Sequence, residues 1–283
     1  MHLASSWCRR RAADLGGQLS LAAELGFQGL GMLHEEGPER GEDGLSALPA
    51  GLPGTSIAVL DERRLAAPDG SPAAPETLLA ALRGLSCSRL LLHAGLDARP
   101  ELAARGQALL DRVLLGETVE AEDEALEELQ RADRLPRERQ LEDFLRRLSG
   151  IRRLAPGLAL LVTVDPSPAG LLDLDSLRLL LAEGASLDLG YWHDCLASAQ
   201  REAAGSEPAA AWLDAFAASC AGATLEDHHG GVGGQPPGTG GVDWQLLAEY
   251  LPPAAVRVLR VAPSYPGMVV EEARASLQAM RLT

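Results

Sequence analysis

The chain has 283 residues, of which 46% are hydrophobic, so it is long enough to bury one barrel-sized core or two smaller ones. Its formal net charge of -15 argues against nucleic acid as a partner, because binding to phosphates needs a basic surface. All 25 basic residues are arginine. The absence of lysine from the sequence excludes Schiff-base, pyridoxal-phosphate and P-loop mechanisms that depend on a lysine.

The cysteines and the N-terminal residues bear on the expected zinc content and cellular location of the protein. Cys8, Cys87, Cys195 and Cys220 are widely spaced and form no C-x-x-C pair, which favours buried thiols over a structural zinc site. Arginines follow a very short apolar stretch at the start, the reverse of the order in a secretory signal. No apolar run approaches the roughly 20 residues that cross a bilayer. We therefore expect a cytoplasmic, bacterial-type protein with no membrane partner.

Short apolar runs alternate with amphipathic segments, a pattern typical of a parallel sheet covered by helices. The expected strands are His2–Trp7, Gln28–Leu33, Ser56–Leu60, Arg89–His93, Leu158–Val164, Ser186–Leu189, Ala223–Glu226 and Val256–Val261. The expected helices are Leu19–Leu25, Pro75–Leu85, Pro100–Leu115, Arg137–Leu154, Leu174–Glu183, Glu207–Cys220, Trp244–Tyr250 and Val269–Arg281. Eight strands are what a closed barrel needs, and no linker divides the chain. The sequence predicts an α/β fold, a single (β/α)8 TIM barrel over residues 1–283.

Two segments depart from this alternation. Gly37–Pro53 is rich in glycine, proline and acidic residues and is expected to be a long loop after the second strand. Glu117–Arg134 is strongly acidic and is expected to be an insertion, either a solvated helix or a mobile segment. A functional lid or a surface for a partner is the alternative for this acidic insertion.

Three stretches resemble a known family: LSLAAELGFQGLGML, SLDLGYWHDCLASAQ and GATLEDHHGGVGGQPPGTGGVDW. They are similar to the xylose isomerase-like, or sugar phosphate isomerase/epimerase, TIM barrels. In that family the metal ligands are a Glu ending the fifth strand, an Asp and a nearby His after the sixth, a His in the seventh and a Glu ending the eighth. The resemblance implies a Mg²⁺, Mn²⁺ or Zn²⁺ ion that polarises a sugar carbonyl.

The resemblance assigns a metal-binding role to Asp194 and Asp227, which both fall on aspartates of the family's motifs. His228 and His229 follow in a glycine-rich loop that can turn either ring inward. We expect one of these histidines as a displaced metal ligand, and a solvent-exposed polar loop is the alternative.

Other residues are expected to act on the substrate. Asp165 lies two residues beyond the position of the fifth-strand Glu and is the expected proton-transfer group, with an aspartate that starts a turn as the alternative. His193 belongs to the family's Trp-His-Asp run and is expected to be catalytic, with a packed, hydrogen-bonded histidine as the alternative. His93 and Trp192 are expected to contact the substrate.

Several positions depart from the family's metal pattern, namely Thr163, Ala197, Thr224 and Arg260. Arg260 stands where the family has its final Glu, and a guanidinium cannot ligate a metal because it does not lose its proton. We expect Arg260 at the barrel mouth as a substrate-binding residue, paired with Asp194, with Asp227 or with a bound anion.

These observations leave two functions open. The first is a sugar phosphate isomerase/epimerase-like enzyme that interconverts a sugar or polyol with a rearranged or weak site for Mn²⁺, Mg²⁺ or Zn²⁺. The alternative is a metal-free, ligand-binding or pseudoenzyme barrel that has lost the family's metal chemistry. Either function has a small sugar, polyol or sugar phosphate as its partner and leaves a homo-oligomer open.

Overall fold

The structure is a computed structural model that describes residues 1–34, 57–66, 72–117 and 135–283. The expected loop Gly37–Pro53 lies outside the described residues, as does the acidic insertion apart from Glu117.

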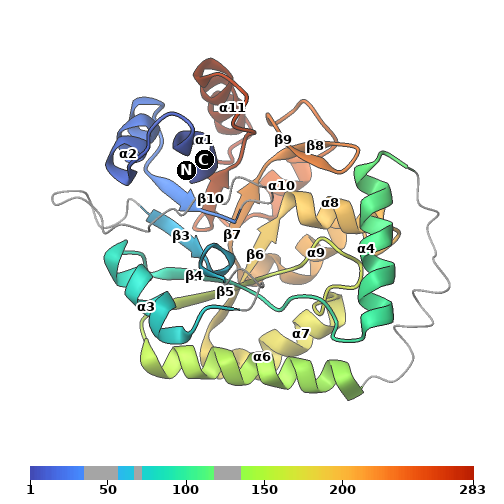
Figure 1. The fold of residues 1–283 in the computed structure, drawn as a ribbon. Helices are drawn as coiled ribbons and strands as arrows, with labels where there is room; N and C mark the ends of the chain where they lie inside the picture. Colours follow the sequence, from blue (N-terminus) through green and yellow to red (C-terminus); the bar gives the residue numbers. More distant parts are fainter. Residues whose placement is uncertain (35–56, 67–71, 118–134) are drawn as a thin grey trace.

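Eight parallel strands close into a barrel in the order β1-β10-β7-β6-β5-β4-β3-β2 (Figure 1). These strands are β1 His2–Ala4, β2 Leu30–Met32, β3 Ile57–Asp61, β4 Arg89–His93, β5 Ala159–Thr163, β6 Leu189–Asp194, β7 Cys220–Leu225 and β10 Val256–Leu259. Two further strands of the described residues, β8 Asp227–His229 and β9 Val232–Gln235, form a separate antiparallel hairpin. The expected (β/α)8 barrel is confirmed.

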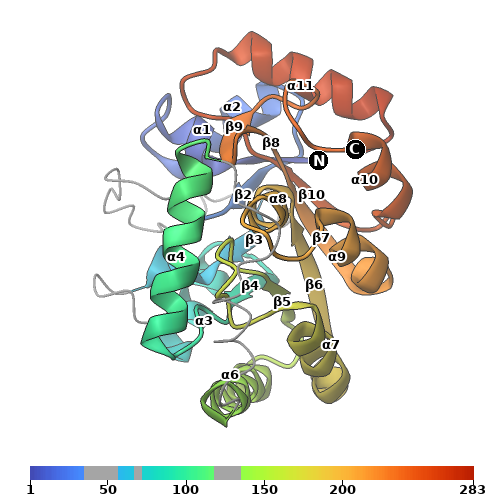
Figure 2. The same ribbon diagram turned by 90° about the vertical axis from the view of Figure 1, so that its right-hand side faces the viewer.

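Helices follow the strands and surround the barrel (Figures 1 and 2). They are α1 Ser5–Arg9, α2 Leu15–Glu24, α3 Pro75–Gly84, α4 Pro100–Leu114, α6 Leu135–Leu154, α7 Leu174–Glu183, α8 Cys195–Ala203, α9 Ala209–Phe216, α10 Trp244–Tyr250 and α11 Gly267–Ala279. Short 3-10 turns occupy Glu62–Leu65, Gly184–Leu187 and Ala217–Ser219. None of the described helices is both long and apolar enough to span a bilayer.

Side chains that alternate along the strands divide the core into two layers. A small cluster comprises Ala4, Leu33, Ala58, Val59, Leu91, Leu161, Trp192 and Val258, and its inward-facing members, among them Val59, Leu91, Leu161, Trp192 and Val258, fill the barrel interior. A larger cluster lies between the outer face of the barrel and the helices. Trp192 fits inside because Gly222 on the neighbouring strand has no side chain, and a Cβ there would come within 2.3 Å of the indole ring. The residue two positions after an inward-facing residue also points inward, and at the C-terminal end of a strand it lies at the barrel mouth.

The sixth strand differs from the expectation. It spans Leu189–Asp194, whereas Ser186 and Leu187 belong to a 3-10 turn. The run from Tyr191 to Asp194 is thus part of the strand rather than a loop after it. Tyr191 and Trp192 are both fully buried, on opposite faces of this strand.

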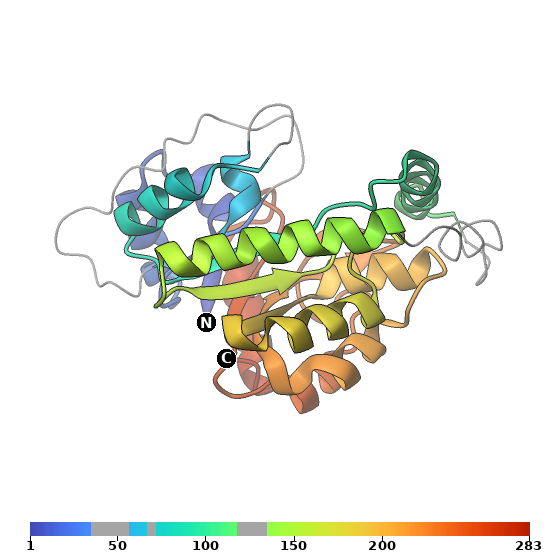
Figure 3. The same ribbon diagram turned by 90° about the horizontal axis from the view of Figure 1, so that it is seen from below.

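The barrel mouth is bordered by the β8–β9 hairpin and by the helices α4 and α8. Helix α4 contacts α8, and a Cβ added to Gly231 in the hairpin would come within 2.6 Å of Val113 in α4. Gln200 of α8 donates a hydrogen bond of 2.7 Å to the carbonyl of Gly231. The two termini lie close together on the other side of the molecule from α4 (Figures 1 and 3).

Candidate functional site

A cavity of about 550 Å³ opens at the C-terminal ends of the strands, where TIM barrels place their active sites. Its charged and histidine lining consists of Arg10, His34, Arg63, His93, Asp194, Glu226 and Arg260. Its apolar lining includes Leu114, Val164, Pro166, Leu196, Val232 and Val261. The cavity therefore offers contacts both to a charged group and to the apolar part of a ligand.

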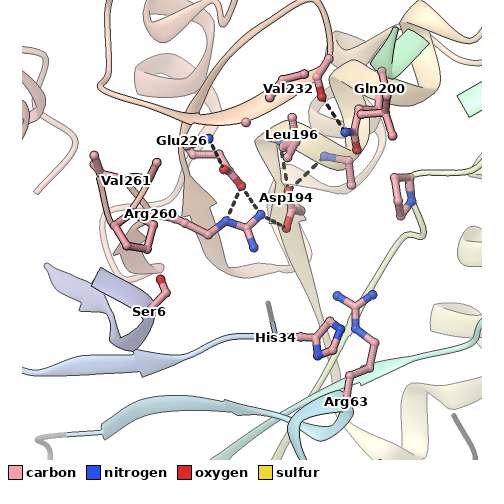
Figure 4. Close-up of a pocket in the computed structure, with 18 of the residues that line it drawn as sticks. Ser6, His34, Arg63, Asp194, Leu196, Gln200, Glu226, Val232, Arg260 and Val261 are labelled. Carbon is pink, nitrogen blue, oxygen red and sulfur yellow. Dashed lines mark hydrogen bonds and ion pairs between the residues drawn. The ribbon is translucent and has the colours of Figure 1, made fainter. Parts of the chain in front are cut away.

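Arg260 binds two carboxylates at the centre of this cavity (Figure 4). Its Nε and Nη2 both donate to Oε1 of Glu226, and Nη2 also lies 3.5 Å from Oδ2 of Asp194. The three residues come from the ends of three neighbouring strands, β10, β7 and β6. The expected pairing of Arg260 with Asp194 is present, and Glu226 is a further partner.

Burial strengthens the electrostatic interaction between Arg260 and Glu226. The carboxyl of Glu226 is 2% exposed, and burial raises its pKa even though Arg260 opposes the shift. Burial alone would lower the pKa of Arg260, but Glu226 and Asp194 outweigh this and raise it. The guanidinium therefore stays charged and fixed between the two acids.

Asp194 is held in place by the helix that follows it. Its Oδ1 accepts hydrogen bonds from the backbone N–H groups of Leu196 (3.1 Å) and Ala197 (3.0 Å), so it caps the N-terminus of α8. Its Oδ2 is the atom that faces Arg260. Both oxygens of Asp194 thus have a partner.

A second polar group lies across the cavity, where Figure 4 shows Arg63 and His34 facing Arg260. The buried Asp61 accepts hydrogen bonds from the backbone N–H groups of His34 (3.2 Å) and Arg63 (2.9 Å). Its Oδ2 lies 3.2 Å from Nε2 of His93. Burial alone would raise the pKa of Asp61, but the charges of His93 and Arg63 outweigh it and the pKa is lowered. Asp61 is therefore ionised and orients His93.

Comparisons with known proteins identify the architecture. No protein-family model matches the sequence, and no curated protein matches it. Solved structures do match over nearly the whole chain. The probable 3-DHS dehydratase AsbF from Bacillus anthracis has a TM-score of 0.55 at 10% identity, covering 98% of this chain and 99% of that chain. The chain has the fold of xylose isomerase-like TIM barrels.

Two further structures agree with this fold. An L-ribulose 3-epimerase has a TM-score of 0.52 at 13% identity, covering 99% of this chain and 93% of that chain. A xylose isomerase domain containing protein from Salmonella typhimurium LT2 has a TM-score of 0.51 at 11% identity, and the match covers 100% of both chains. At these identities the likeness concerns the fold, so the chemistry depends on the residues at the mouth.

The residues at the mouth do not fit the divalent metal that the resemblance implies. At the positions of the family's ligands, Thr163 offers only a hydroxyl, and the hydroxyl of Thr224 already accepts a hydrogen bond from Trp192. Arg260 stands at the position of the family's final Glu and pairs with Asp194. Across residues 1–34, 57–66, 72–117 and 135–283, no three His, Cys, Asp or Glu side chains gather in a way that could hold a metal ion. A catalytic metal needs about three such ligands.

Asp227 lies outside the cavity, although it was the second expected metal ligand. Its buried carboxylate accepts five hydrogen bonds, from the backbone N–H groups of His228, Gly238, Gly240 and Val242 and from Nε1 of Trp244. Burial alone would raise the pKa of Asp227, but these hydrogen bonds outweigh it and the pKa is lowered. A Cβ on Gly240 would come within 2.5 Å of Oδ1, so the glycine allows this approach. In these contacts Asp227 organises the glycine-rich loop.

His193 and His228 line a different cavity of about 440 Å³ next to α8 and α10, while His229 is exposed. The ring of His193 points outward from the barrel, where Nδ1 lies 3.0 Å from the hydroxyl of Tyr191. Burial lowers its pKa to about 4, so this histidine is neutral near pH 7. The strand period explains the placement, since Trp192 points inward and its neighbour must point outward.

Two other expected substrate residues also lie away from the cavity lining. Trp192 is fully buried inside the barrel and donates a hydrogen bond of 2.9 Å to Thr224. Asp165 accepts a hydrogen bond of 3.0 Å from the backbone N–H of Ser167, the turn that was the alternative for this residue. Of the expected site residues, the structure brings His93, Asp194 and Arg260 together at one cavity.

Glu226 and Asp61 were not expected at the site. For Glu226 a signal was present, because it shares the parity of Thr224 on its strand while Asp227 has the opposite parity. Because Asp227 matches the family's aspartate, the family's motif assigned the site to Asp227, one residue after Glu226. Asp61 falls at the end of the third strand, one residue beyond the expected boundary.

Proposed function

We propose that this protein is a metal-free barrel that binds a small anionic molecule, a sugar phosphate or sugar acid, at the mouth of the barrel. The observation that carries this proposal is the guanidinium of Arg260, which is fixed between Glu226 and Asp194. Its positive charge lies at the centre of the mouth, where it offsets part of the negative charge of the two carboxylates that would otherwise attract a cation.

The rest of the lining supports an anion as the ligand. The cavity surface carries three arginines and two histidines against two carboxylates, both of which are bound to Arg260. Nε of Arg63 is buried without a hydrogen-bond partner, so this guanidinium has a donor available. Arginine binds phosphate and carboxylate groups through paired donors, which gives both affinity and orientation.

The fold supports a sugar-like body for this anion. One barrel of the same fold is an L-ribulose 3-epimerase, so its substrate is a sugar. In our proposal this protein shares the class of ligand with such barrels and does not share the metal-dependent isomerisation that the resemblance implies.

A calorimetric titration with inorganic phosphate in the presence of EDTA tests this proposal. Arg63→Gln removes one charged donor from the cavity, and we expect the phosphate affinity to fall about tenfold, since a hydrogen bond to a charged group contributes about 1.5–3 kcal/mol. Arg178→Gln is the matched control, because Arg178 pairs with Asp175 on the surface of α7. Phosphate binding that needs an added divalent metal, or that is equal in the two variants, contradicts the proposal.

A further inference from the structure

Besides Nε of Arg63, two more buried polar atoms beside the cavity lack a hydrogen-bond partner among the described residues. They are Nδ1 of His93 and Oγ1 of Thr163. The side chain of His93 is 8% exposed, and Thr163 is 3% exposed. Burying a polar atom without a partner costs free energy, so such atoms in a folded protein point to a missing partner.

The two residues are neighbours at the barrel mouth. His93 ends β4, Thr163 ends β5, and the two are paired in the register of these strands. Both have the parity of the interior residues Leu91 and Leu161, so both side chains point into the barrel. His93 lines the 550 Å³ cavity, as does Val164, the residue that follows Thr163.

The chemistry of the two atoms is complementary. Asp61 is ionised and can only accept, so Nε2 of His93 carries the proton that is donated to it. Nδ1 of His93 accepts a hydrogen bond when the ring is neutral and donates one when the ring is charged, and the hydroxyl of Thr163 can donate or accept. An alcohol group of a ligand would satisfy both atoms in either state of His93, because a hydroxyl can donate one hydrogen bond and accept another.

We propose that His93 and Thr163 form a subsite for a hydroxyl group, so that the ligand is a polyol carrying an anionic group. This inference rests on the proposed function, in which Arg63 and Arg260 bind the anionic group. Asp61 is a positioning residue in this subsite, since it fixes the ring of His93 and the proton on Nε2.

Thr163→Val tests the unsatisfied hydroxyl without any ligand. The valine keeps the shape of threonine and removes the buried oxygen, so we expect the melting temperature to rise by about 2 °C or more. Thr224→Val is the matched control, since Thr224 is equally buried inside the barrel but accepts a hydrogen bond from Trp192. Its melting temperature should fall. If Thr163→Val lowers the melting temperature as Thr224→Val does, an ordered water already satisfies Thr163 and the subsite is refuted.

A second test compares the affinities of sorbitol 6-phosphate and inorganic phosphate. We expect the wild-type protein to bind the polyol phosphate at least tenfold more tightly, and Thr163→Val to bring this ratio close to one. Equal affinities in the wild type, or a ratio that Thr163→Val leaves unchanged, overturn the hydroxyl subsite and leave the anion site intact. If the wild-type protein binds neither sorbitol 6-phosphate nor inorganic phosphate, the result contradicts the proposed function itself, and the subsite with it.

Discussion

Replacing Arg260 with methionine is expected to lower the free energy of unfolding by about 3 kcal/mol at pH 7. The change leaves Glu226 buried without its partner and leaves Asp194 with only its contacts to the start of α8. Urea denaturation monitored by circular dichroism measures the loss. Arg178→Met is the control, since its exposed pair with Asp175 should contribute less than about 1 kcal/mol.

The loss should depend on pH in a defined direction. Burial already raises the pKa of Glu226, and removing Arg260 raises it further because the opposing charge is gone. A folded state with a raised carboxyl pKa binds its proton more tightly than the unfolded chain does, so this contribution to stability is present at low pH and lost as the pH rises through the folded pKa. The difference between the variant and the wild type should therefore shrink at about pH 4. Equal stability of the two proteins at pH 7 would show that Arg260 does not hold Glu226.

Asp227→Asn is expected to lower the free energy of unfolding by about 3 kcal/mol. The amide N–H₂ of asparagine would face N–H groups that donate hydrogen bonds to the carboxylate in the wild type. Oδ2 accepts from Gly238, Gly240 and Trp244, and Oδ1 accepts from His228 and Val242, so either orientation of the amide opposes at least two donors.

Asp243→Asn is the matched control for this prediction. Asp243 lies in the same loop and caps α10 by accepting from Gln245 and Leu246, a role that asparagine fills equally well. Its stability should change by less than about 0.5 kcal/mol. A stable Asp227→Asn variant that loses divalent-metal binding would instead support the metal-ligand role that the sequence suggested for Asp227.

The period of the strands explains what the sequence could predict about this fold. Eight apolar runs separated by helices predict the closed barrel, because only a few arrangements bury such runs. The boundary of the sixth strand was missed, since Tyr191 and Trp192 are buried on opposite faces and break the plain pattern of apolar runs. Without the boundary, the sides to which His193 and Asp194 point remained undetermined.

The partners of the site residues depend on contacts that sequence reasoning did not reach. Glu226 and Arg260 are 34 residues apart, and they meet because β7 and β10 are adjacent in the closed barrel. Asp61 meets His93 in the same way, from neighbouring strands. Similarity to a family motif favoured Asp227 over Glu226, whereas strand parity favours Glu226 at the mouth.

Titration of Mn²⁺ into the chelator-treated protein by calorimetry tests the central claim most directly, with Arg260→Glu as the comparison. The wild type should bind Mn²⁺ only weakly, because the positive charge of Arg260 repels the ion and occupies Asp194 and Glu226. Arg260→Glu removes this charge and adds a third carboxylate at the mouth, so its affinity for Mn²⁺ should be at least about tenfold higher. Stoichiometric binding of Mn²⁺ by the wild type that is lost in Asp194→Ala would contradict a metal-free mouth.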